Sequence, residues 1–346
     1  MGDAAYHPFK LPTGRWRIPF RSRPSNSRSS FHKMPTEMVL EIVNHLSLVD
    51  QLALALSCTK LFNIVFRHAI EKLLLPPPDT SRKEVVENLL IRLEKDLGST
   101  YYFCPLCSKL HTFYPVPSPA DPWIAYMKPL HKCWKVMEHR PAHSCHRLGY
   151  HHGRLVMNRH FHGPQAGLPI TWINATAPHG YGSRPKPGDW TITYAGKIVQ
   201  DELVLRITRV LKARDVEGLY TILKNGIHNV CPHIFTDLDT PGSTFEGLAL
   251  CDKIQFTGQI LSGFCNKCLT DYTVEFEKTP GWCRQKRCSM VLQSYHLVGD
   301  FRDPQDWKWR AFISDLSRRL YTRFDEVRDT KTYPPGLAFS RWQEQS

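Results

Sequence analysis

The sequence predicts an α+β protein, with an N-terminal three-helix module followed by a mixed α+β region. Residues 34–75 are dense in apolar side chains at helical spacing. Later segments alternate apolar and polar residues, as half-buried strands do. Two Cys-x-x-Cys pairs have the spacing of zinc ligands, so we expect one or two structural zinc ions to stabilise the second region.

The leading segment, residues 1–30, predicts a disordered basic tail. From Met1 to Lys33 the chain has seven basic residues and one acid, and Ser and Pro are frequent. Such a tail is typical of a solubilising leader; the alternative is a nuclear-import or nucleic-acid-binding arm. The rest of the net charge of +13 is spread too thinly to indicate a partner.

Composition favours an intracellular chain, cytoplasmic or nuclear, that makes no membrane contact. No window approaches the ~18 apolar residues that span a bilayer, and the first residues lack the apolar core of a signal peptide. In a reducing compartment the 11 cysteines are free thiols or metal ligands rather than disulfides.

Residues 31–75 predict three short helices with more apolar surface than they can bury. From Met38 to Phe66, 19 of 29 residues are apolar, and Asp50 stands where an N-cap would begin the second helix. Units below ~40 residues usually need a partner or a metal for stability. The block therefore predicts either a partner chain or burial against the rest of this one.

The residue types in this block resemble an F-box domain. The opening string Met34–Leu46 has an apolar residue and Pro, a Glu two residues on, and aliphatic residues leading to a Leu. Phe62 stands where many members have Trp. The second half of the block matches at Asp50, Leu52, Leu56, Cys58 and Leu61.

This resemblance implies that the module docks onto the adaptor subunit of a cullin-based ubiquitin ligase. The contact would be helix against helix, with desolvated apolar anchors carrying most of its energy. The residues expected to form or support it are Met34, Pro35, Ile42, Leu46, Leu52, Leu56, Cys58, Leu61 and Phe62.

Residues 76–100 predict a linker and a helix. The prolines 76–78 cannot continue the preceding helix. The string Ser81–Glu84 has the spacing of a capping box, and Gly98 is a plausible C-cap.

Residues 101–335 predict a substrate-binding α+β region, and residues 336–346 a tail. A helix is expected to open at Asp303-Pro304, with an apolar stripe from Trp309 to Phe324. We find no repeat of 20–50 residues, so the arrays that many ligase receptors use to hold substrates are missing. The expected strands lie near 190–194, 203–207, 272–276 and 290–297, and a short helix near 216–223.

Four residues of this region predict a zinc site. Cys265 and Cys268 have the spacing that places two thiolates on one tetrahedral ion, and Cys231 and His233 form a compact pair upstream. The alternative is that the thiols are small buried packing groups. Spare candidate ligands are Cys251, Cys283 and Cys288.

Cys104 and Cys107 form a second pair of the same spacing. We expect Cys145, with Cys133 or His143, to complete a site there. His111 and His131 are also within reach in sequence. The Cys-Pro-x-Cys pattern occurs in dithiol redox proteins too, where a long helix follows it. Prolines between 115 and 122 exclude such a helix here.

Three further segments resemble filamentous-fungal F-box proteins. They are Tyr102–His111, Leu155–His160 and Asp306–Trp309. This resemblance implies a shared architecture over most of the chain, and brings no substrate or activity with it.

We expect recruitment rather than catalysis. The histidines clustered between His139 and His162 lack acidic partners at motif spacing, so we interpret most of them as surface residues. The sequence has no phosphate-binding loop, nucleophile elbow or H-E-x-x-H motif. The expected function is that of an F-box substrate receptor, which holds the adaptor, and through it a cullin, and presents an unknown protein substrate.

Two alternatives stay open. One is a zinc-dependent nucleic-acid-binding protein, although the basic cluster has few interleaved aromatics and no nucleic-acid motif is present. The other is a structural protein that binds the adaptor without a cullin.

Overall fold

The structure is a computed structural model, and its described residues divide between two compact units, Met1–Glu71 and Lys72–Ser346. The predicted tail, residues 1–30, and the prolines 76–78 lie outside the described residues. None of the helices in the described part of the chain is long and apolar enough to cross a membrane. The described residues are 33–74, 81–112, 119, 138–139, 146–178, 190–225, 229–235, 246–247, 254, 260–265, 267–279, 287–304, 306–313 and 333–344.

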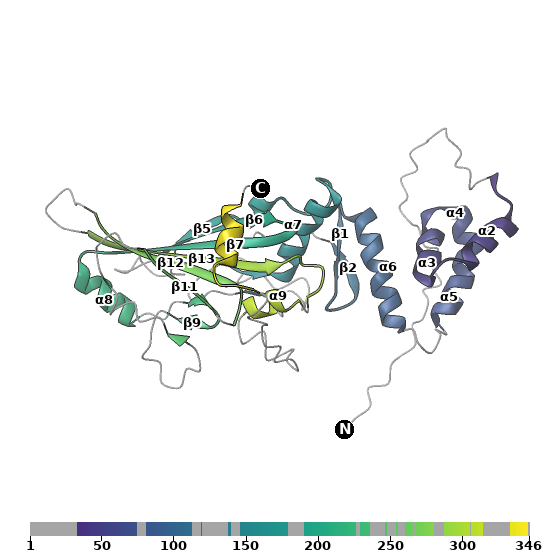
Figure 1. Cartoon of the computed structure of the whole chain (residues 1–346). Coiled ribbons are helices and arrows are strands. Elements are labelled where there is room, and N and C mark those ends of the chain that lie inside the picture. The colour runs from purple at the N-terminus through teal and green to yellow at the C-terminus, as the bar shows by residue number, and fades with distance from the viewer. Residues whose placement is uncertain are drawn as a thin grey trace, which may run out of the picture. The chain divides into compact units, whose positions relative to one another are not determined.

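The first unit consists of short helices, as the apolar block predicts (Figure 1). The last three elements follow one another without a break and together form the predicted third helix. The elements are α2 (Thr36–Asn44), α3 (Leu48–Ser57), α4 (Thr59–Leu61), a π-helical turn (Phe62–Phe66) and the larger part of α5 (Arg67–Leu74), which ends just past the boundary at Glu71. The inward-facing side chains are buried: Val39, Val43, Leu52, Ala55, Leu61, Val65 and Ala69.

Helix α3 begins earlier than predicted. Its N-cap is Ser47, whose hydroxyl accepts a hydrogen bond from the Asp50 N–H (3.2 Å). Asp50 is therefore in the first turn, where a carboxylate is favoured by the helix dipole. The next residue, Gln51, is buried, and its Nε2 donates to the carbonyls of Val43 (3.0 Å) and Leu46 (2.9 Å) at the end of α2.

The second unit opens with helix α6 (Arg82–Leu97). The helix begins where the sequence predicts, but the predicted capping box does not form, because Ser81 makes no capping hydrogen bond with its side chain. The hairpin of β1 (Tyr101–Cys104) and β2 (Lys109–Thr112) follows.

A buried ion pair joins α6 to helix α7 (Tyr150–His162). The Glu94 carboxylate contacts the Arg154 guanidinium at 2.5 Å, and both side chains are buried. The same carboxylate accepts hydrogen bonds from Asn158 Nδ2 (2.7 Å) and from the Phe103 N–H of β1 (2.8 Å). One carboxylate thus fixes three elements to one another.

Helix α7 lies in a region where the sequence predicts no long regular element. Its first nine residues, 150–158, are all buried, so the helix has no polar face over that length. A helix that is buried all round lacks the alternation by which an amphipathic helix is detected. The residue types, rich in His, Arg and Gly, also do not read as a core helix.

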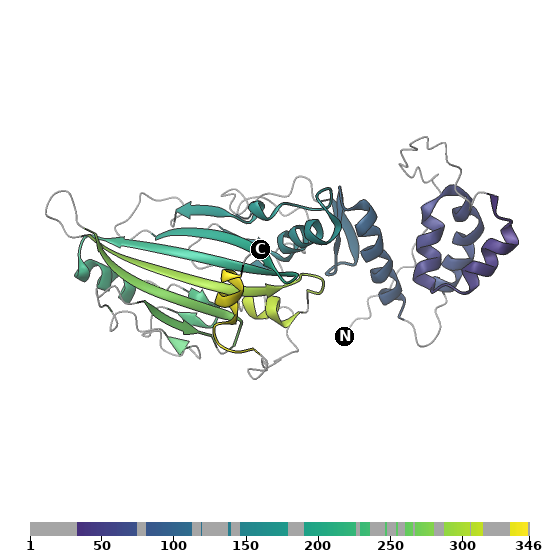
Figure 2. The same ribbon diagram turned by 45° about the horizontal axis from the view of Figure 1, so that its top comes forward.

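The second unit is built on a six-stranded antiparallel sheet with the order β11-β12-β13-β7-β6-β5 (Figures 1 and 2). The four predicted strands are confirmed, as β6, β7, β12 and β13, and each is longer than predicted. The strands are β5 (Ala175–Pro178), β6 (Trp190–Val199), β7 (Glu202–Ala213), β11 (Leu261–Phe264), β12 (Thr270–Thr279) and β13 (Arg287–Gly299). Shorter strands are β3 (Glu138–His139), β4 (Leu148–Gly149), β8 (Asn229–Cys231), β9 (Ile234–Phe235) and β10 (Glu246–Gly247).

One face of the sheet carries the main hydrophobic core. Alternate residues of β7, such as Leu203, Leu205 and Ile207, are buried on this face. Helices α7, α8 (Val216–Asn225) and α9 (Trp307–Phe312) pack on it. The predicted short helix near 216–223 is thereby confirmed.

The opposite face is covered at one end by helix α11 (Leu337–Gln343). Residues 336–346, predicted to be a tail, thus contain a helix that packs on buried Tyr295 and Leu297. The Asp271 carboxylate of β12 accepts hydrogen bonds from the Gly336 (2.9 Å) and Phe339 (3.0 Å) N–H groups. A strand residue therefore supplies the N-terminal cap of this helix.

Helix α9 differs from its prediction at both ends. Asp306, not Asp303, is the N-cap and accepts from the Lys308 N–H. The helix ends at Phe312, and Ile313 is already extended. The remainder of the predicted stripe, 316–324, lies outside the described residues.

Candidate functional sites

Helix α2 carries apolar side chains both toward the core and toward solvent. Val39 and Val43 are fully buried, whereas Met38 is 56% and Ile42 37% exposed. Residues i and i+4 are neighbours on a helix, so Met38 and Ile42 form an exposed apolar pair. Leu40, also exposed, lies on the other flank of the buried stripe. We call Met38, Leu40 and Ile42 the α2 surface.

The nine residues predicted to contact the adaptor differ in how far they are buried. Leu52 and Leu61 are buried, and in this structure they pack within the module rather than face outward. Met38 and Leu40 were not predicted as contact residues, although their position beside a buried apolar stripe was a signal that could have indicated this role. Pro35 and Ile42 are exposed, and the half-buried ones are Met34, Leu46, Leu56, Cys58 and Phe62.

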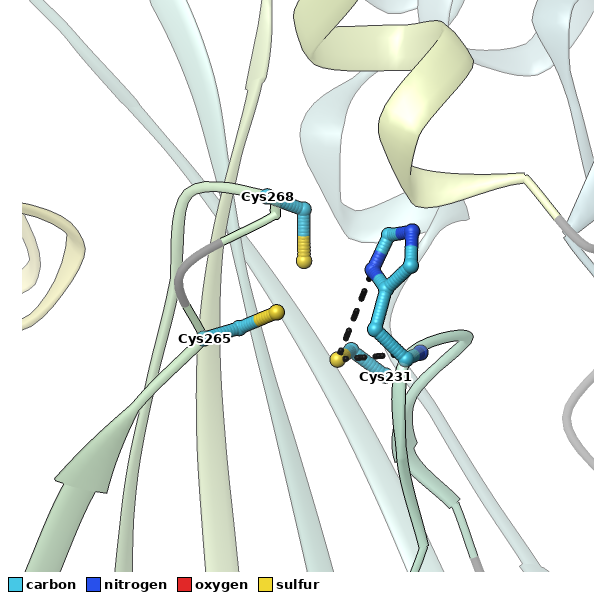
Figure 3. A group of neighbouring side chains, drawn as sticks. Cys231, Cys265 and Cys268 are labelled. Atoms are coloured by element: carbon cyan, nitrogen blue, oxygen red, sulfur yellow. Dashed lines mark hydrogen bonds between the residues drawn. The ribbon is translucent and has the colours of Figure 1, made fainter. Parts of the chain in front are cut away.

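The four residues predicted as one zinc set lie together in the second unit. Cys231, His233, Cys265 and Cys268 are all buried, and their ligand atoms lie within 4.8 Å of one another. The first two come from the turn between β8 and β9, and the other two from the turn between β11 and β12. Figure 3 shows the three sulfurs pointing into the same space.

Backbone N–H groups are directed at two of these sulfurs. The His233 N–H donates to Cys231 Sγ (3.4 Å), and the Lys267 N–H donates to Cys265 Sγ (3.3 Å). Each donor stands two residues after the sulfur that accepts from it, so each turn curls its own backbone around a sulfur. Hydrogen bonds of this kind favour the thiolate over the thiol.

The third sulfur leads into a buried polar network. The Thr270 hydroxyl lies 3.1 Å from Cys268 Sγ and 2.9 Å from His296 Nδ1. His296 Nε2 lies 2.9 Å from the Ser294 hydroxyl, to which Arg209 donates from 3.2 Å. All five residues are buried, so the cluster is continuous with polar groups inside the main core.

Crowding makes the three thiols unequal in acidity. Burial raises the pKa of Cys231 and of Cys268. Hydrogen bonds with Cys231 and Cys268 lower the pKa of Cys265, and so does His233. The ionisation of each thiol therefore depends on its neighbours, and a bound divalent cation would favour the thiolate form of all three.

A second cluster lies on the β1–β2 hairpin. Cys104, Cys107 and His111 bring their ligand atoms within 4.8 Å of one another, with Cys107 Sγ 3.0 Å from His111 Nε2. The predicted partner Cys145, like Cys133 and His143, lies outside the described residues. His111 was one of several open candidates, and the hairpin register places it in the cluster. Of the spare cysteines, Cys288 is buried in β13 and belongs to neither cluster.

The interpretation of the clustered histidines as surface residues is wrong for four of them. Aromatic packing accounts for two: His139 stacks on Phe312 (ring centroids 4.0 Å apart) and His146 on Tyr194 (3.5 Å). Burial lowers the pKa of His139 to about 3, so its ring is neutral. The four buried histidines are His139, His146, His151 and His152, whereas His160 and His162 are exposed and His143 lies outside the described residues.

The family description of the F-box domain matches residues 31–72. Residues 31–72 are an F-box domain. The match covers α2 to α5 nearly completely, and confirms the resemblance seen in the sequence. F-box domains bind adaptor subunits of cullin-based ubiquitin ligases and act through protein–protein contacts. The comparisons with curated proteins and with solved structures found no match to this chain.

Proposed function

We propose that this chain is a substrate receptor of a cullin-based ubiquitin ligase. Its F-box domain holds the adaptor subunit, and its second unit recruits a protein target. The observation that carries the proposal is the F-box domain at residues 31–72, with apolar side chains exposed on its first helix.

The α2 surface supports the adaptor contact. An unpaired aliphatic side chain on a small helical unit has a hydrophobic cost in water that burial against a partner removes. Ile42 stands on the same flank as Met38, and the half-buried Leu46 follows one turn later. Met38 and Ile42 on one flank of α2, with Leu46 two residues beyond the end of the helix, suit the helix-against-helix contact that the resemblance implies.

The second unit supports target recruitment because it is a compact body with its own core. The buried residues of its main core and of the small cluster under α11 lie between Leu148 and Ala338 among the described residues, all within this unit. A separate folded unit joined to an adaptor-binding module increases the local concentration of whatever it binds near the ligase. In this proposal the chain positions its target and performs no chemistry, because ubiquitin transfer belongs to other subunits.

The adaptor contact is tested by binding of the full chain to purified adaptor, with Ile42→Asp as the perturbing variant. A charge placed at a desolvated anchor costs about 2 kcal/mol or more, which weakens binding by a factor of about 30. The matched control is Ile91→Asp, an exposed aliphatic residue on α6 outside the F-box domain. Because Ile42 is exposed, the variant keeps the helical circular dichroism of the parent. Equal binding by the folded Ile42→Asp chain would remove the α2 surface from the contact.

Assembly with the cullin separates a ligase receptor from a protein that binds the adaptor alone. The parent chain is expected to co-elute with adaptor and cullin as one complex, and Ile42→Asp to elute apart. In cells, target ubiquitination is expected to require Ile42 but not Ile91. A complex with the adaptor that excludes the cullin would overturn the ligase assignment and leave the F-box contact standing.

A further inference from the structure

The cluster at the β8–β9 and β11–β12 turns has the composition of a closed metal site. Three sulfurs and one imidazole are a complete set of tetrahedral zinc ligands, and a set supplied wholly by protein is typical of structural sites. All four residues are buried, which leaves no open position for water or substrate. We propose that Cys231, His233, Cys265 and Cys268 bind one structural zinc ion, and that the buried Arg209 balances its charge.

The spacing of the ligand atoms fits this ion. Zinc–sulfur bonds of about 2.3 Å place the sulfurs of a tetrahedral site about 3.8 Å apart. The ligand atoms of the cluster lie within 4.8 Å of one another, so a shift of side chains alone closes the site. The N–H groups of His233 and Lys267 already donate to two of the sulfurs. Such outer hydrogen bonds orient ligands and are a normal part of metal sites.

Packing alone does not account for these contacts. Thiols that serve only as small apolar groups have no need of N–H donors directed at their sulfurs. Here two sulfurs accept from backbone N–H groups, and the third has the Thr270 hydroxyl at 3.1 Å. The imidazole of His233 is buried beside them, with Nδ1 3.9 Å from Cys231 Sγ. Two sulfurs thus accept hydrogen bonds that favour a thiolate, and the Thr270 hydroxyl is placed to donate to the third.

Arg209 supplies the positive charge that such a site requires. A divalent ion with three thiolates and a neutral imidazole carries one net negative charge. Arg209, in β7, is only 3% exposed, and no ion pair joins it to a carboxylate within the described residues. Arg209 is linked to the cluster through Ser294, His296 and Thr270, and the Thr270 hydroxyl lies 3.1 Å from Cys268 Sγ. A buried guanidinium without a counter-charge is costly, and the anionic zinc site would provide one.

The ion would join segments that are distant in the chain. Cys231 and His233 precede residues 234–264, and Cys265 and Cys268 follow them. The ion would therefore fix the β8–β9 turn to β11, the edge strand of the sheet. Closing such a loop in the folded state stabilises the unit more than local contacts in either turn do. The inference is independent of the F-box domain, and adaptor binding and metal content are measured separately.

The metal is tested on the full chain purified under reducing conditions without added chelator. We expect about one zinc per chain in the Cys107→Ser background, which disables the second cluster. Cys268→Ser in that background is expected to lose the zinc, whereas Cys288→Ser retains it, because Cys288 is buried outside the cluster. Zinc content below about a tenth of an equivalent in the Cys107→Ser chain, or full retention by folded Cys268→Ser, would overturn the site.

X-ray absorption at the zinc edge tests the ligand set without relying on a variant that fails to fold. The chain with Cys107→Ser is expected to show three sulfurs at about 2.3 Å and one nitrogen at about 2.0–2.1 Å. If Cys107→Ser itself does not fold, the parent chain gives the same test, because a sulfur-rich tetrahedral shell is still required. A shell of oxygen and nitrogen ligands would show adventitious metal and refute the assignment.

The counter-charge is tested by chelator competition on two variants of Arg209. Arg209→Met removes the charge and keeps much of the volume, and we expect about tenfold or greater loss of zinc affinity, as other outer-shell changes produce. Arg209→Lys restores a charge and is expected to recover part of that loss. If Arg209 served only to fill space, Met would replace it at least as well as Lys. Equal zinc affinities of Arg209→Met, Arg209→Lys and the parent would therefore refute the role of Arg209 as the counter-charge.

Discussion

The carboxylate of Glu94 is the point at which α6, β1 and α7 are joined, and Glu94→Ala tests that role. The side chain is 1% exposed, contacts Arg154 at 2.5 Å, and accepts from Asn158 and from the Phe103 N–H. Removal leaves a buried guanidinium without a carboxylate; its remaining partners include the carbonyls of Phe301 and Arg302, the Tyr150 hydroxyl and the Phe103 ring.

The expected loss follows from the unpaired charge. Breaking a buried ion pair from one side costs about 3–5 kcal/mol. The Phe103 N–H also loses its acceptor, but it belongs to the same hydrogen-bond network, so the free energy of this loss does not simply add to that of the broken ion pair. Typical domains have free energies of unfolding of about 5–15 kcal/mol, so the change removes a large share of the stability of the second unit. For a unit of this size the melting temperature should fall by about 6–20 °C.

Urea unfolding followed by tryptophan fluorescence measures this loss. Residues 31–75 contain no tryptophan and eight of the nine tryptophans lie beyond residue 120, so the signal reports mainly on the second unit rather than the F-box domain. Glu84→Ala is the control, because Glu84 is an exposed glutamate of the same helix. The double variant Glu94→Leu/Arg154→Met should recover much of the loss, since an apolar pair of similar volume often replaces a buried ion pair without penalty. A Glu94→Ala chain within about 1 kcal/mol of the parent would refute the reasoning.

Two further predictions concern the F-box domain and acid stability. Gln51→Ala removes the amide that donates to the carbonyls of Val43 and Leu46, and should destabilise the F-box domain by about 1–3 kcal/mol. Thermal unfolding of residues 31–75, followed by circular dichroism, measures this loss, with the exposed Glu41→Ala as the control. An unchanged melting curve would show that water replaces the amide. Because burial lowers the pKa of His139 from 6.5 to about 3, only the unfolded chain takes up this proton near pH 6. Stability from this group is complete above about pH 6.5 and should fall by about 1.4 kcal/mol between pH 7.5 and 5.5. The ring of His139 stacks on Phe312, and the charge of Arg209 also lowers its pKa. The change in the free energy of unfolding with pH should therefore be smaller by one proton in His139→Gln, and an equal slope in the variant and the parent would contradict this.

Local spacing was enough to predict the parts of the fold in which neighbouring residues determine the structure. The strands around Leu205 and Leu292 were predictable because their side chains alternate between a buried and a more exposed face. The pair Cys265 and Cys268 was predictable because a tight turn brings i and i+3 sulfurs together. The F-box domain was recognised from the identity of the residues at the start of α2. The apolar pattern alone did not decide whether the block binds a partner or packs against its own chain.

Features that depend on contacts across the chain were not predictable from local spacing. His146 is buried because Tyr194 of β6 stacks on it, and no nearby residue indicates that. Ser47 replaced Asp50 as the cap because helix α3 begins one turn earlier, at a boundary that both residue types suit. His111 joined Cys104 and Cys107 only through the hairpin register, although the Cys-x-x-Cys-x-x-x-His spacing was a usable signal.

The position of α11 has a consequence for the order in which the protein can complete its fold. This helix follows every strand that it covers, and its cap is Asp271, which lies far earlier in the chain. During synthesis the apolar face around Tyr295 and Leu297 therefore waits uncovered until residues 333–344 have left the ribosome. For that interval the nascent sheet presents the kind of exposed apolar surface that aggregates readily and that chaperones bind.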